Sequence, residues 1–101
     1  MRNRKDLDTI LRGILGTGNV YFQPPENIKI EYPCIIYGKS DYFTRHADNI
    51  KYKMDRRYTI KAIYRHPDST LPDMIAELPM CSFDRHYEAD NLNHDIFTIY
   101  W

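Results

Sequence analysis

The hydrophobic pattern begins with a helical period. Five apolar residues near the N-terminus recur at spacings of three and four, which places them on one face of a helix. They are Leu7, Ile10, Leu11, Ile14 and Leu15. Asn3 stands where a helix N-cap is needed, and Gly16 stands where the chain can end the helix in a left-handed conformation. The sequence therefore predicts a first helix between Asn3 and Gly16.

From residue 20 the period changes to two, which is typical of strands. Val20–Phe22 forms a short strand that Pro24 and Pro25 end, since neither proline has an N–H for a ladder. The alternating segment 28–32 is interrupted by Pro33 and continues as a more fully buried strand over residues 34–37. Residues 39–55 are polar and irregular, and we interpret them as an extended loop or hairpin arm.

The second half of the chain repeats this change of period. Residues 57–65 alternate as a strand, with Tyr58, Ile60, Ala62 and Tyr64 on one face. A short helix follows, with Thr70 as N-cap and Asp73 completing a capping box, and Pro79 ends it. Its apolar face is formed by Leu71, Met74, Ile75 and Leu78.

Two alternating runs complete the chain, over residues 81–87 and 95–101, with turn-forming residues over 88–93 between them. They predict a hairpin in which Cys81, Phe83, Arg85 and Tyr87 share one face. The order is therefore α-β-β-β-α-β-β. Clustered strands with two helices indicate an α+β fold, with an antiparallel or mixed sheet of about five strands and the helices on one face.

Composition narrows the class of protein. A chain of 101 residues fits one domain (1–101), and 43% hydrophobic with 28% charged residues excludes an intrinsically disordered chain. No apolar run is long enough for a transmembrane helix, and no apolar segment follows the charged N-terminus, so we expect no signal peptide. Cys34 and Cys81 lie far apart without a CxxC motif, and we expect two buried, free thiols and no disulfide.

Charge is divided unevenly along the chain, although its net value is zero. Residues 1–65 carry 13 basic and 7 acidic side chains, whereas residues 66–101 carry 1 basic and 7 acidic. A uniformly basic nucleic-acid-binding protein does not have this distribution. The distribution is instead typical of a protein that packs a positive face against the negative face of a neighbouring copy.

Residues with catalytic or metal-binding chemistry do not form a specific motif. His86 and His94 flank the predicted turn with Asp84 and Asp95 beside them, and facing strands would bring zinc ligands together there. Their spacing matches no specific zinc pattern, so polar surface or interface residues are the preferred interpretation. Cys81 falls on an apolar face, where a thiol is inert. We expect no catalytic residues, no metal, no cofactor and no enzyme activity.

Several phrases of the sequence resemble small neck proteins of long-tailed bacteriophages, the tail terminator or tail-completion family. The resemblance covers nearly the whole chain except residues 39–55. It rests on matches of short sequence segments. These are Val20–Pro25, Tyr32–Tyr37, His66–Ser69, Leu78–Tyr87 and Asp90–Thr98.

The resemblance implies a small α+β protein of the virion neck, assembled in the bacterial cytoplasm as a ring of about six copies. Such a ring sits on the head-proximal end of the tail tube, ends tube polymerisation and docks to the head–tail connector or stopper protein. Genome DNA passes through its lumen without sequence-specific contact. The family is not enzymatic, has no cofactor and does not associate with membranes.

A closed ring joins one patch of a subunit to a different patch of its neighbour. We therefore predict that the basic segment of one copy contacts the acidic C-terminal region of the next. The candidate residues are Arg45, Lys51, Lys53, Arg56 and Arg57 on one side, with Asp84, Glu88, Asp90 and Asp95 on the other. A head–tail connector or stopper protein, and a small nucleic-acid-binding module, remain as alternatives at this stage.

Overall fold

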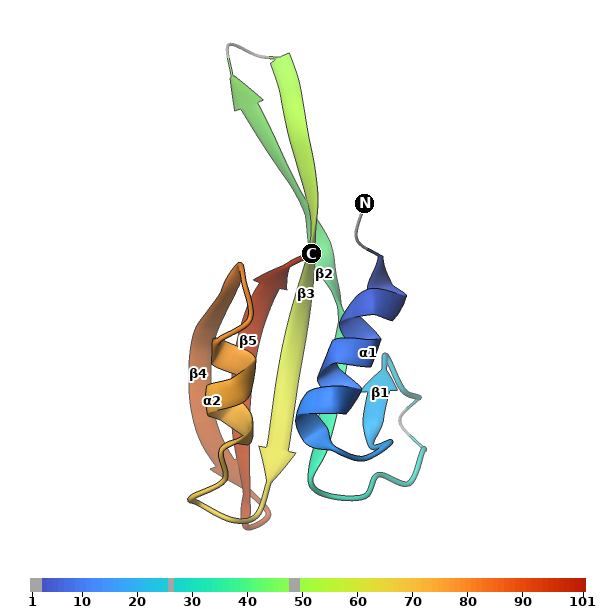
Figure 1. Cartoon of the computed structure of the whole chain (residues 1–101), viewed down its shortest axis with the longest axis vertical. Helices are drawn as coiled ribbons and strands as arrows, with labels where there is room; N and C mark the ends of the chain where they lie inside the picture. Colours follow the sequence, from blue (N-terminus) through green and yellow to red (C-terminus); the bar gives the residue numbers. More distant parts are fainter. Residues whose placement is uncertain (1–2, 26, 48–49) are drawn as a thin grey trace.

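The computed structural model describes the backbone of residues 3–25, 27–47 and 50–101, together with their side chains except those of residues 41–56 (Figure 1). The predicted order of elements is confirmed. The elements are α1 (Arg4–Leu15), β1 (Val20–Phe22), β2 (Cys34–Ala47), β3 (Ile50–Tyr64), α2 (Leu71–Ala76), β4 (Cys81–Ala89) and β5 (Leu92–Tyr100).

All five strands belong to one mixed sheet in the order β1-β2-β3-β5-β4. β1 pairs with β2 in parallel, and every other neighbouring pair is antiparallel. Both helices lie against the same face of the sheet (Figure 1). The predicted α+β fold is therefore confirmed, and the sheet is mixed because the loop 23–33 returns the chain to the start of β2 beside β1.

α1 forms where its capping residues place it. The Asn3 side chain accepts a hydrogen bond from the Asp6 backbone N–H, and the Asp6 side chain accepts one from the Asn3 backbone N–H. Gly16 ends the helix with φ 80°. Leu7 and Leu11 are buried against the sheet, so the predicted apolar face faces the core.

The main core lies between the helices and the sheet. β3 contributes Tyr58, Ile60, Ala62 and Tyr64 to it, as its alternation predicts. The helix side is completed by Leu7, Leu11, Leu71 and Ile75, and β5 adds Phe97 and Ile99. A smaller cluster of Cys34, Ile63 and Leu92 lies on the other face, where Ile30 from the loop 23–33 packs against it.

β2 and β3 continue beyond the rest of the sheet as a hairpin arm, residues 41–56 (Figure 1). β1 pairs with β2 only over residues 35–37, and β5 pairs with β3 only over residues 57–64. In the described backbone, the two strands of the arm therefore pair only with each other. The arm gives the molecule an extent of 48 Å along its longest axis, against 24 and 22 Å across.

Three local predictions are wrong. Segment 28–32 is loop and not strand, because β1 already occupies the edge of β2. Thr70 stands at the N-cap of α2 without capping through its side chain, whereas Ser69 Oγ accepts the Leu71 N–H. The even alternation of β4 is broken by a bulge between Phe83 and Arg85.

Candidate functional site

The predicted basic residues map to the hairpin arm. Arg45, Lys51, Lys53 and Arg56 belong to its strands, and their side chains lie outside the described residues. Arg57 stands at the base of the arm, half-buried, where it pairs with both Asp41 and Tyr100 in the sheet register. The basic stretch therefore lies on a projecting hairpin, which is one of the two forms predicted for this segment.

The predicted acidic residues do not all lie on the surface. Asp84, Glu88 and Asp90 are exposed on β4 and on the turn that follows it. Asp95 is only 4% exposed and lies on the helix face of β5. Unlike the three exposed acids, Asp95 therefore lies in the interior of its own chain and not on the surface from which a neighbour would be contacted.

Asp95 forms the centre of a hydrogen-bonded group at the helix face of the sheet. Tyr64 donates its hydroxyl to Asp95 Oδ2 at 2.5 Å, and His86 Nδ1 lies 2.6 Å from Asp95 Oδ1. Burial, followed by the bond to Asp95, raises the pKa of Tyr64. These hydrogen bonds join residues of β3, β4 and β5 around one buried carboxylate.

The two histidines that flank the turn lie on opposite faces of the sheet. The bulge at Asp84 reverses the alternation of β4, so Tyr87 joins His94 on the face away from the helices, with ring centroids 4.6 Å apart. His86 faces the helices and Asp95. Within the described part of the chain, no group of three or more His, Cys, Asp or Glu side chains is arranged to hold a metal ion.

The two thiols are also separated by the sheet. Cys34 is buried in the smaller cluster, whereas Cys81 packs against the main core on the helix side. Both are free cysteines, as predicted. Burial raises the pKa of Cys34 to about 11, and burial raises the pKa of Cys81 as well. Neither thiol has the lowered pKa that an activated nucleophile needs.

β4 forms an exposed edge of the sheet. It pairs only with β5, and residues 82–88 are all exposed. Phe83 is 56% exposed although its ring lies edge-on to Phe97 at 5.6 Å. Met74 in α2 and Met80 before β4 are also exposed. An unpaired edge with exposed apolar side chains is a surface that other chains can cover.

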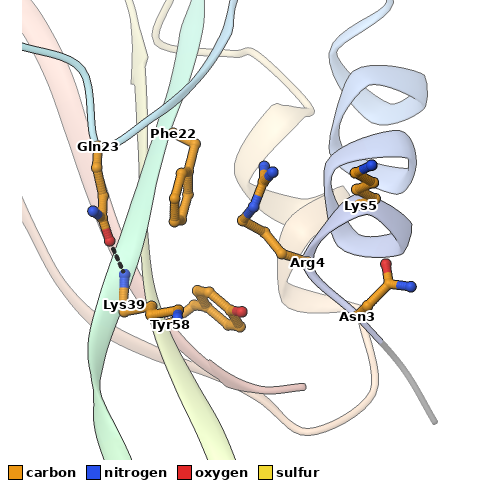
Figure 2. A pocket seen from close by; sticks show the side chains of 7 residues that line it. All are labelled: Asn3, Arg4, Lys5, Phe22, Gln23, Lys39 and Tyr58. Carbon is orange, nitrogen blue, oxygen red and sulfur yellow. Dashed lines mark hydrogen bonds between the residues drawn. The ribbon is translucent and has the colours of Figure 1, made fainter.

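A hollow of about 510 Å³ lies between the first turn of α1, the end of β1 and the base of the hairpin arm (Figure 2). We call it the basic hollow. No residue of this site was predicted from the sequence. Its lining residues are Asn3, Arg4, Lys5, Phe22, Gln23, Lys39 and Tyr58. Three of the seven are cationic and none is acidic.

Arg4 is held in place at the wall of the basic hollow. Its guanidinium lies over the Phe22 ring at 4.5 Å from the centroid and donates to the Tyr37 hydroxyl at 3.2 Å. The hydrogen bond to Tyr37 raises the pKa of Arg4 further above its ordinary value. Arg4 is also 4.0 Å from Asp8.

Asp8 follows Arg4 by one turn of α1, and its carboxylate accepts hydrogen bonds from Tyr37 and Arg12. Tyr37 donates its hydroxyl to Asp8 Oδ2 at 2.5 Å, and Arg12 donates to Asp8 Oδ1. Burial alone would raise the pKa of Asp8, but these two hydrogen bonds outweigh it and lower the pKa. Burial, with the bond to Asp8, raises the pKa of Tyr37 to about 12. Asp8 therefore stays ionised without facing the hollow.

Tyr58 lines the hollow and has an incomplete set of hydrogen bonds. Its side chain is fully buried, and its hydroxyl has no hydrogen-bond partner among the described residues. Figure 2 shows the ring between Lys39 and the first turn of α1, with the hydroxyl directed toward Arg4 and Asn3. A buried hydroxyl without a partner costs about 1–3 kcal/mol. The group is therefore ready to bind an oxygen atom that enters the hollow.

The one sequence signal for the hollow is the position of Arg4 and Lys5. Cations in the first turn of a helix oppose its dipole, which favours acids there. Phe22, Lys39 and Tyr58 come from three different strands, and only the tertiary structure brings them to Arg4.

No model of a known protein family matches the chain, and no curated protein sequence matches it significantly. None of the helices in the described residues has the length and apolar character needed to span a bilayer.

Proposed function

We propose that the chain is a structural subunit of a virion neck, a tail terminator that forms a ring at the head-proximal end of a phage tail tube. The observation that supports this most strongly is the hairpin arm. Residues 41–56 form two strands that project beyond the sheet, and their described backbone pairs only within the arm. An isolated two-stranded hairpin is marginally stable in water. Contact with a neighbouring molecule would supply the stability that the arm lacks.

The distribution of charge supports contacts between unlike surfaces. The arm carries Arg45, Lys51, Lys53 and Arg56, whereas the β4–β5 turn carries Glu88 and Asp90. The arm and this turn lie at opposite ends of the long axis (Figure 1). Two different patches that complement each other make a heterologous contact, which closes into a ring when the rotation between copies allows it. The ring ends tube polymerisation and docks to the head connector, and genome DNA passes through its lumen.

The exposed edge of β4 provides a further surface for assembly. An edge strand with Met80 and Phe83 exposed beside it would be covered in a ring. Burying these side chains between subunits or against the tube would remove apolar area from water.

The test is the mass of the purified chain in solution, measured by light scattering with and without the tail-tube protein encoded in the same gene cluster. We expect a ring of about six copies, alone or on the tube. A monomer that does not bind the tail-tube protein but binds the head connector would indicate a stopper role and not a terminator role. A chain that ignores both and binds DNA in a salt-dependent manner would refute the structural role.

Charge-reversal variants then test the arm. Lys51→Glu with Lys53→Glu should abolish the ring, because both residues belong to the arm and neither pairs with the remainder of the sheet. Lys29→Glu with Arg65→Glu is the matched control, because it changes the net charge by the same amount at two exposed residues outside the arm. Loss of the ring in both variants would indicate a general effect of net charge and would contradict a specific role for the arm.

A further inference from the structure

The basic hollow contains cations without counter-ions. Lys5 and Lys39 are exposed and form no ion pair with any described residue. Arg4 contacts Phe22 and Tyr37, and its distance of 4.0 Å to Asp8 is at the limit of an ion pair. The hollow therefore has a concentrated positive potential that the described chain does not neutralise.

Tyr58 is an independent indication that the hollow binds a ligand. Its buried hydroxyl lacks a partner among the described residues and lines the same space as the three cations. A phenol hydroxyl can donate to an anionic oxygen, and lysine ammonium groups can donate to the same oxygen or its neighbour. The volume of about 510 Å³ is within the range of sites that bind small molecules or side chains.

The anion that the chain itself can offer is the tip of its β4–β5 hairpin. Asp90 and Asn91 form a two-residue turn with φ 55° and 62°, and Glu88 precedes it in β4. Glu88 and Asp90 are exposed and form no ion pair within the described part of the chain. Asp95, the acidic residue of β5, is buried and hydrogen-bonded to Tyr64 and His86.

We propose that the basic hollow is a carboxylate-binding site and that its ligand is the acidic β4–β5 turn of a second copy, with Glu88 and Asp90 facing Lys5, Lys39 and Tyr58. This inference rests on the proposed ring, to which it assigns a specific contact. The first turn of α1 and the base of the arm, which line the hollow, lie at the end of the body away from the β4–β5 turn (Figure 1). The turn therefore reaches the hollow of another copy and not its own. The contact is heterologous, as a ring requires.

Carbodiimide cross-linking tests this contact in the unmodified protein, since it joins a lysine amine to a carboxylate that touches it. A mixture of light and isotope-labelled heavy copies separates contacts between copies from contacts within one. We expect light–heavy links that join Lys5 or Lys39 to Glu88 or Asp90. If such links are missing at high protein concentration, or join other residues, the proposal is wrong.

Charge reversal supplies the matched variants. Lys5→Glu with Lys39→Glu, or Glu88→Lys with Asp90→Lys, should each weaken self-association by about tenfold or more. A mixture of the two variants should restore association, because each turn then meets a hollow of opposite charge. The control, Lys29→Glu with Arg65→Glu, changes the net charge as the hollow variant does, at exposed residues outside the hollow and the turn. It should change association by less than about twofold.

The hydroxyl is tested separately by Tyr58→Phe, which preserves the ring of the side chain. Loss of a hydrogen bond to a carboxylate should weaken association by several-fold without lowering the urea midpoint. An unchanged association constant would mean that the Tyr58 hydroxyl does not bind the carboxylate.

The outcomes distinguish this proposal from the function on which it rests. If a ring forms and no reversal at the hollow or the turn changes it, the contact between hollow and turn is wrong. The pairing of the arm with that turn is then wrong as well, whereas the ring itself stands. If no ring forms with or without the tube protein, while light–heavy links still join hollow and turn, the contact is right and the terminator function is wrong.

Discussion

Asp95→Ala should destabilise the fold and should not act primarily through assembly. The carboxylate is 4% exposed and accepts a hydrogen bond from Tyr64, which is itself 6% exposed. Removing the carboxylate leaves the Tyr64 hydroxyl buried without that partner, at a cost of about 1–3 kcal/mol. The bond to His86, whose side chain is 42% exposed, adds at most about 1 kcal/mol.

The expected loss is therefore about 1–4 kcal/mol in the free energy of unfolding. A domain of this size has about 5–15 kcal/mol available, so the variant remains folded at 25 °C. Urea unfolding followed by far-UV circular dichroism and by the fluorescence of Trp101, the single tryptophan, measures the change. Asp95→Asn is the conservative control, because its carbonyl oxygen still accepts from Tyr64, and it should lose less.

A double-mutant cycle separates the hydrogen bond from other effects of the substitution. Tyr64→Phe leaves the buried carboxylate with one bond fewer, whereas the double variant removes both groups together. The double variant should be about 1–3 kcal/mol more stable than the sum of the single effects predicts. Additive single effects, or a urea midpoint for Asp95→Ala equal to that of the wild type, would refute the assignment of Asp95 to the core.

Three further predictions concern a histidine, two glycines and the two thiols. Burial, with the charge of Lys61, lowers the pKa of His94 below 6.5, so unfolding takes up a proton and stability falls as the pH drops below 6.5. The urea midpoints at pH 7.5 and pH 5 should therefore differ less in His94→Gln than in the wild type, and an equal difference would contradict this. Gly16→Ala should cost about 1 kcal/mol because φ is +80°, whereas Gly13→Ala, inside the helix, should stabilise by about 0.5–1 kcal/mol; thermal melts decide. A thiol reagent at pH 8 should modify Cys81 faster than buried Cys34, and equal rates would contradict the structure.

The first helix shows how far local rules reach. The capping pair Asn3 and Asp6, the glycine stop at Gly16 and the buried Leu7 and Leu11 depend on residues within a few positions of one another. Hydrogen bonds and side-chain periodicity of this range are encoded locally, so the sequence predicted them correctly. The same reasoning predicted the helix face of β3 and the turn between β4 and β5.

The wrong predictions have a common physical cause. The bulge at Asp84 inserts one residue into β4, and an extra residue reverses which side chains face the core. Tyr87 consequently changes face. Asp95 was predicted to lie at the surface because its charge suggested it, but its position opposite Ala62 places it against the core, where Tyr64 satisfies it. No local pattern reveals a partner 31 residues away in the chain.

The sequence by itself determined the order of the elements, the capping of α1, the α+β class and the separation of positive from negative charge along the chain. These follow from periodicity, from residue type and from counting. The tertiary structure decided that β1 joins β2 in parallel, that the polar segment after residue 39 becomes a projecting hairpin, and that Arg4, Phe22, Lys39 and Tyr58 enclose one hollow. The reason is that strand order and face depend on which distant segments pair, and that pairing depends on packing between segments far apart in the chain.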